Sequence, residues 1–117
     1  MTNLEALKLN LNHKEYFSDN EYGQILEMNG LDEFDEYSKA NDEREMLESV
    51  YTVLSYLAND IDNLRKVETE FVTTSAAQQY LESRMKSIRA EIDRLDDLEK
   101  SDGSPSVTGY LFYNSRI

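Results

Sequence analysis

Few residues of this chain combine the types and spacing that metal or cofactor chemistry requires. His13 is the only histidine and there is no cysteine, which excludes thiolate sites and any cluster of imidazoles. The run Asp60-Ile61-Asp62-Asn63 begins like a calcium-binding loop. Leu64 and Arg65 then occupy positions where an oxygen ligand and a glycine are needed. We therefore expect no metal and no cofactor, and interpret this run as the solvated face of a helix.

Neighbouring carboxylates are the other residues that could do chemistry. They occur as Asp32/Glu33, Asp35/Glu36 and Asp96/Asp97. Acid–base catalysis would require an apolar cleft that shifts a pKa, and no pattern in the sequence predicts one. The chain also lacks a nucleophile elbow and a glycine-rich phosphate loop. Runs of charge usually form solvated surface, so we predict that the protein is not an enzyme.

The charge of the chain limits its partners. Its 117 residues carry a net charge of −12, which disfavours neutralising a nucleic-acid backbone or binding an anionic membrane. No apolar run approaches the ~20 residues of a membrane-spanning helix. The opening residues, 1–5, lack the basic and apolar regions of a signal peptide. We expect the product to stay in the compartment where it is made.

Two amphipathic stripes between about Asp42 and Leu98 dominate the pattern. Apolar residues recur at three- and four-residue steps, as on one face of a helix, with one interruption at Glu68. A polar turn at 72–75 separates the stripes and predicts an antiparallel αα-hairpin, although a coiled coil with other chains is an alternative. The predicted hairpin core is Leu47, Val50, Leu54, Leu57, Ile61, Leu64, Leu81, Met85, Ile88, Ile92 and Leu95, and Phe71 continues the first stripe.

Capping signals predict where helices begin. Thr2 with Glu5 and Ser18 with Glu21 form capping boxes that open two short helices, over 3–11 and up to 29. Gly30 is suited to end the second helix, and Gly23 inside it could mark a close helix crossing. We expect 31–40 to be a loop or irregular turn. The long helices are expected to begin with the pairs Asp42/Glu45 and Ser75/Gln78.

The last residues form an unusual tail. A linker containing Asp102-Gly103-Ser104-Pro105 precedes an aromatic and β-branched run. The tail would be an exposed apolar liability in a monomer, unless it is disordered or folds back on its own helices. We favour a docking arm that adds an extended strand to a partner, with contacts from Val107, Tyr110, Leu111, Phe112 and Tyr113. The expected organisation is an all-α domain over 1–100, followed by a linker and docking arm over 101–117.

The order of these elements resembles the head–tail connector, or neck adaptor, proteins of tailed bacteriophages. The resemblance covers about 1–98. It rests on these segments: Leu4-Glu5-Ala6-Leu7-Lys8-Leu9, Tyr16-Phe17-Ser18-Asp19-Asn20-Glu21, Ile25-Leu26-Glu27-Met28-Asn29-Gly30-Leu31, Leu54-Ser55-Tyr56-Leu57-Ala58-Asn59-Asp60, Glu70-Phe71-Val72-Thr73-Thr74-Ser75-Ala76-Ala77 and Tyr80-Leu81-Glu82-Ser83-Arg84-Met85.

The resemblance implies a virion protein made in the host bacterial cytoplasm. Such proteins form a ring, commonly dodecameric, below the portal protein, extend the DNA channel and connect the capsid to a stopper or tail protein. The C-terminal arm often reaches the portal, and DNA passes through without specific binding. An acidic lumen would suit this role because it repels phosphates. The alternative is a small acidic helical binding module, similar to an antitoxin or chaperone, that masks a basic partner.

Overall fold

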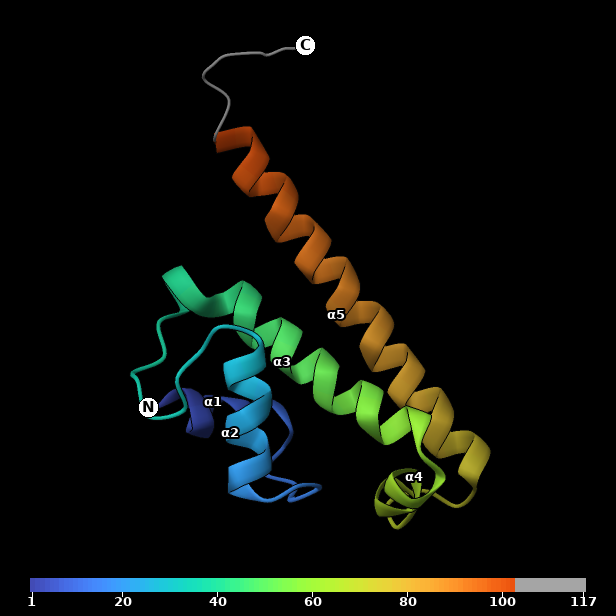
Figure 1. Cartoon of the computed structure of the whole chain (residues 1–117). Coiled ribbons are helices and arrows are strands. Elements are labelled where there is room, and N and C mark those ends of the chain that lie inside the picture. The colour runs from blue at the N-terminus through green and yellow to red at the C-terminus, as the bar shows by residue number, and fades with distance from the viewer. Residues whose placement is uncertain (103–117) are drawn as a thin grey trace.

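The computed structural model describes residues 1–102, and this part of the chain is all-α (Figure 1). Its helices are α1 (Asn3–Asn10), α2 (Asp19–Met28), α3 (Lys39–Asn59), α4 (Ile61–Glu68) and α5 (Thr74–Asp102). This described part measures 51 × 33 × 18 Å. The elongated shape follows from α5, whose 29 residues span about 43 Å.

The two short N-terminal helices begin as the sequence predicts. Thr2 Oγ1 accepts a hydrogen bond from the Glu5 amide, and Glu5 Oε1 accepts one from the Thr2 amide. Ser18 and Glu21 make the same reciprocal pair at the start of α2. Gly30 follows Asn29, the C-cap of α2, and has a positive φ of 87°, which an L-residue adopts only with strain. Both capping boxes are confirmed.

The core lies between α3 and its neighbours on two sides. On one side α3 packs against α1 and α2, and on the other it packs against α5 (Figure 1). Within residues 1–102, α5 packs on α3 and α4, and Arg84 of α5 also donates a hydrogen bond to the Asn10 carbonyl at the end of α1, at 3.3 Å. Fully buried side chains are contributed by every helix and include Leu7, Tyr22, Leu26, Met46, Val53, Leu57, Val67, Leu81 and Ile92. Because α3 is covered on both sides, it is the central element of the fold.

The expectation of one continuous helix from Asp42 to Phe71 is wrong. The chain leaves the helical conformation at Asp60, where φ is −132° and ψ is 125°. Asp60 Oδ1 accepts a hydrogen bond from the Asp62 amide and so caps a new helix, α4. Asp62 in the first turn of α4, with Arg65 and Lys66 in the last, complements the helix dipole. The residues interpreted as a solvated helix face are therefore a helix boundary.

This break changes which side chains of the first stripe face the core. Ile61, expected in the hairpin core, is 68% exposed, whereas Leu64 and Val67 are buried. Glu68, where a continuous stripe would need an apolar residue, is half-buried beside Val67. The interruption at Glu68 therefore has a physical cause: α4 packs with a different helical phase from α3.

The two predicted start signals of the long helices are displaced. α3 begins at Lys39, and Asp42 Oδ2 accepts a hydrogen bond from the Ser38 amide instead of opening the helix itself. α5 begins at Thr74, and Thr73 Oγ1 accepts from the Ala76 amide, so Ser75 is not the cap. These shifts leave the helices in place but move their ends by two to four residues, as is common for sequence-derived boundaries.

The segment between α2 and α3 is held by the N-terminus. The amides of Asn3 and Leu4 donate to the carbonyls of Asp35 and Glu33, and the Tyr37 amide donates to the Met1 carbonyl. Thr2 and Glu36 form an isolated antiparallel bridge. A loop was expected here, and the structure shows that it is tied down by backbone hydrogen bonds.

Candidate interaction surface

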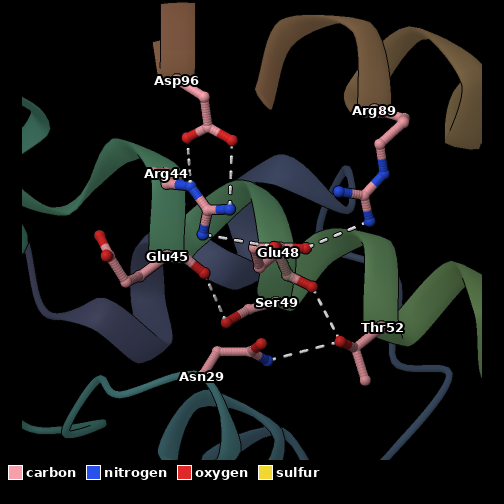
Figure 2. Close-up of polar contacts among 8 residues, drawn as sticks. All are labelled: Asn29, Arg44, Glu45, Glu48, Ser49, Thr52, Arg89 and Asp96. Atoms are coloured by element: carbon pink, nitrogen blue, oxygen red, sulfur yellow. Dashed lines mark hydrogen bonds and ion pairs between the residues drawn. The ribbon is translucent and has the colours of Figure 1, made fainter. Parts of the chain in front are cut away.

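A network of ion pairs joins α3 to α5 (Figure 2). Arg44 Nε lies 2.7 Å from Asp96 Oδ1, and its Nη2 lies 3.4 Å from Oδ2 of the same carboxylate. Arg44 Nη1 also lies 3.3 Å from Glu48 Oε2, whose other oxygen is 3.4 Å from Arg89 Nη2. The hydrogen bond to Asp96 raises the pKa of Arg44 above its usual value. These groups are partly exposed, so each pair contributes at most about 1 kcal/mol.

Hydroxyl groups on the inner side of α3 extend the network toward α2 (Figure 2). The fully buried Ser49 donates to the Glu45 carbonyl, and Thr52 donates to the Glu48 carbonyl at 2.8 Å. Asn29 Nδ2, at the end of α2, donates to Thr52 Oγ1 at 3.4 Å. Each hydroxyl is engaged by the helix backbone, which makes this cluster a structural connection between helices and leaves it without an activated nucleophile.

An apolar groove runs along one flank of α5, beside the network. Its volume is about 480 Å³, and its lining is Tyr51 from α3 with Glu82, Met85, Lys86, Arg89, Ala90 and Asp93 from α5. The Arg89 guanidinium stacks over the Tyr51 ring, 4.6 Å from its centroid. Lys86 makes no ion pair with any residue that the structure describes. This groove offers an apolar floor with cations at its rim.

A second exposed feature is the loop of residues 31–38, here called the Phe34 loop. The Phe34 side chain is 76% exposed, and carboxylates flank it on both sides in the sequence Asp32-Glu33-Phe34-Asp35-Glu36. The Phe34 amide donates to Asp32 Oδ1 at 2.8 Å, which forms a tight turn at the tip. The loop and α2 together line an open hollow of about 440 Å³, whose wall is formed by Gly23, Glu27, Gly30, Leu31, Asp32, Glu33 and Phe34.

The predicted core residues lie at different depths. Val50, Leu54, Leu57, Leu64, Leu81, Ile88 and Ile92 are buried. Leu47, Met85 and Leu95 are half-buried, and Ile61 is at the surface. Met85 also lines the groove on α5. The predicted docking-arm residues Val107, Tyr110, Leu111, Phe112 and Tyr113 lie outside the described residues.

Sequence reasoning missed Tyr51, Arg44 and Phe34 as surface features. Tyr51 and Arg44 have no local signal, because their partners Arg89 and Asp96 are 38 and 52 positions away along the chain. Phe34 had a signal, since a large aromatic between acidic residues is a poor candidate for burial.

Residues 1–102 contain no group of three or more His, Cys, Asp or Glu side chains placed to hold a metal ion. Among the helices described, none combines the length and apolar character needed to cross a membrane. His13 is exposed in a left-handed connector with φ 61°. Comparison with protein-family models, with curated proteins and with solved structures finds no match for the chain.

Proposed function

We propose that the chain is a structural subunit of a bacteriophage neck, a head–tail connector adaptor that assembles as a ring below the portal protein. The observation that carries this proposal is the open flank of α5. One face of this long amphipathic helix packs on α3, while the adjacent face forms an apolar groove without a covering element among residues 1–102. A subunit that completes its packing only on assembly requires such a surface.

In this proposal α3 and α4 together correspond to the first helix of the predicted αα-hairpin, interrupted at Asp60, and α5 corresponds to the second. The network of Arg44, Glu48, Arg89 and Asp96 then fixes the two long helices relative to each other. α5 extends past the body formed by α1, α2 and α3 (Figure 1). α5 runs to Asp102, so the arm that would dock on the portal is confined to residues 103–117, which lie outside the described part of the chain.

The charge of the chain supports a role around moving DNA. The sequence has 24 acidic and 12 basic residues, and at least seven acidic side chains of the described part are tied up in ion pairs. The remaining excess of carboxylates would repel phosphates from the wall of a channel, so that DNA passes without being retained.

A small acidic binding module that masks a basic partner is the second candidate function. The acidic Phe34 loop favours it, because an exposed aromatic between carboxylates can anchor on a basic surface. Such a module would form a small stoichiometric complex and would not require the tail.

The test is electron microscopy of the full-length chain mixed with the portal protein encoded in the same genome, with the chain lacking residues 107–117 as the comparison. We expect a ring beneath the portal with the full-length chain, and loss of that complex without the arm. A small complex of fixed stoichiometry that survives the deletion would instead identify the binding module.

A further inference from the structure

We propose that the pair Asn29-Gly30 is a site of spontaneous deamidation, which the contact between α2 and α3 keeps closed in the folded chain. The pair lies where α2 ends: Asn29 is the C-cap of the helix, and Gly30 follows it with a φ of 87°. The reaction needs only these two residues and water. The site does not depend on the proposed ring function.

The chemistry depends on the residue that follows the asparagine. The Gly30 nitrogen, after losing its proton, attacks Cγ of Asn29 and forms a five-membered succinimide, while the Cγ–Nδ2 bond breaks and ammonia leaves. Water then opens the succinimide to aspartate or isoaspartate, so no oxidant or reductant is consumed. Glycine favours the attack because it has no Cβ to hinder its nitrogen. Asn29 is the only asparagine of the sequence that glycine follows.

The nitrogen that must leave is held by two acceptors. Asn29 Nδ2 donates to the Ile25 carbonyl at 2.9 Å within α2 and to Thr52 Oγ1 at 3.4 Å on α3 (Figure 2). The Thr52 hydroxyl itself donates to the Glu48 carbonyl at 2.8 Å, which leaves its oxygen oriented as an acceptor for Asn29. Attack on Cγ requires the side-chain amide to rotate away from both acceptors, and the α2–α3 contact resists this rotation.

The nitrogen that must attack is held as well. The Gly30 amide donates to the Glu27 carbonyl at 3.0 Å and the Leu31 amide to the Leu26 carbonyl at 2.9 Å, the Schellman arrangement of a helix end. Asn29 has a near-helical φ of −104° and ψ of 13°, whereas ring closure requires the backbone to turn the Gly30 nitrogen toward Cγ. The reaction therefore proceeds only when this helix end opens locally.

The product would keep the helix end from closing again. An aspartate at position 29 places a carboxylate oxygen where Nδ2 now donates to the Ile25 carbonyl, so two acceptors would face each other. Its negative charge is also unfavourable at the C-terminal end of a helix. Isoaspartate adds a carbon to the backbone and disrupts the Schellman pairing. Deamidation is thus a one-way change that loosens the junction from which the Phe34 loop leaves α2.

The first experiment is peptide mapping by mass spectrometry of the full-length chain incubated at mildly alkaline pH, with and without urea. In urea, Asn29 should deamidate faster than Asn20 and Asn41, which precede larger residues, and Gly30→Ala should remove most of the product. Without urea, Asn29 should react at least about tenfold more slowly, because several hydrogen bonds must open first. Equal rates in the two conditions would overturn the gate, and no preference for Asn29 in urea would overturn the site.

Substitutions then test whether the α2–α3 contact is the gate. Thr52→Val removes the acceptor on α3 and should raise the rate at Asn29 without urea about two- to tenfold, the value of one hydrogen bond. Thr69→Val is the matched control, since the Thr69 hydroxyl also donates to a backbone carbonyl, that of Lys66, at the end of α4. No effect of Thr52→Val, or an equal effect of Thr69→Val, would overturn the gate.

A destabilising substitution elsewhere separates local opening from global unfolding. Ile92 is fully buried on α5, and Ile92→Val should raise the equilibrium constant of unfolding about two- to tenfold. The rate at Asn29 should rise much less than this constant. An equal rise would show that the site opens only when the whole chain unfolds and would overturn the local gate.

The consequence of the reaction is tested with a mimic of its product. Asn29→Asp should raise the equilibrium constant of unfolding in urea about tenfold, because two acceptors then face each other at the end of α2. It should also speed hydrogen exchange at the Gly30 and Leu31 amides. Asn41→Asp adds the same charge at an exposed position and is the matched control. Equal effects of the two substitutions would contradict a specific loosening of this helix end.

Discussion

The hydroxyl of Tyr22 organises the connector between α1 and α2, and its removal tests how much this buried group stabilises the fold. Tyr22 is fully buried, and its hydroxyl donates to the Lys14 carbonyl at 2.9 Å. It accepts from the amides of Tyr16 and Phe17 at 3.1 and 3.4 Å. Asn12 and His13 precede these residues with positive φ, so the connector depends on contacts from outside itself.

The expected cost of Tyr22→Phe follows from what each partner loses. The Tyr16 residue is buried, so its amide would remain without a partner, at a cost of about 1–3 kcal/mol. Phe17 is half-buried and Lys14 is exposed, so water can replace the hydroxyl at both, and their net loss is small. We expect a decrease of about 2 kcal/mol in the free energy of unfolding, or about 10 °C in Tm for a domain of this size.

The measurement is urea denaturation followed by circular dichroism, with Tyr56→Phe as the matched control. Tyr56 is 41% exposed, and its hydroxyl makes only a weak contact with the Met28 sulfur, at 3.9 Å. Removing this hydroxyl should lower the free energy of unfolding by less than about 0.5 kcal/mol. If Tyr22→Phe destabilises the protein no more than Tyr56→Phe does, the connector is not held by this hydroxyl and the reasoning fails.

Three further predictions concern stability. Gly23→Ala should stabilise α2 by about 0.5–1 kcal/mol in thermal unfolding, because the new methyl group displaces only the flexible Glu33 carboxylate; a loss of stability would show that this carboxylate cannot move. A double-mutant cycle of Arg44→Met and Asp96→Asn should give a coupling of about 0.5–1 kcal/mol that falls with added salt, and zero coupling would remove this pair as a helix connection. Burial raises the pKa of Tyr16, so the folded state holds this proton more tightly than the unfolded state. The stabilisation that the protonated Tyr16 hydroxyl gives the folded state is complete below the unfolded pKa of about 10 and is lost as the pH rises beyond it. Tyr16→Phe should therefore flatten the decrease in the free energy of unfolding at alkaline pH.

The two capping boxes could be predicted from the sequence because each involves only residues three positions apart. Thr2 with Glu5 and Ser18 with Glu21 satisfy the first amides of their own helices, so these hydrogen bonds do not depend on how the helices pack. The helical class of the chain follows in the same way from the periodicity of its apolar residues. Asp60 also carries a local capping signal, but the apolar stripe running past it favoured a continuous helix.

The amino-acid sequence by itself determined that residues 1–102 are mainly helical and where α1 and α2 begin, because backbone hydrogen bonds and caps act within about four residues. Only the tertiary structure decided that Asp60 ends a helix, that Val67 and not Ile61 is buried, and that Tyr51 lies beside Arg89. These outcomes depend on how α4 and α5 pack on α3. Packing joins residues far apart in the chain, and several helical phases satisfy the same local pattern equally well.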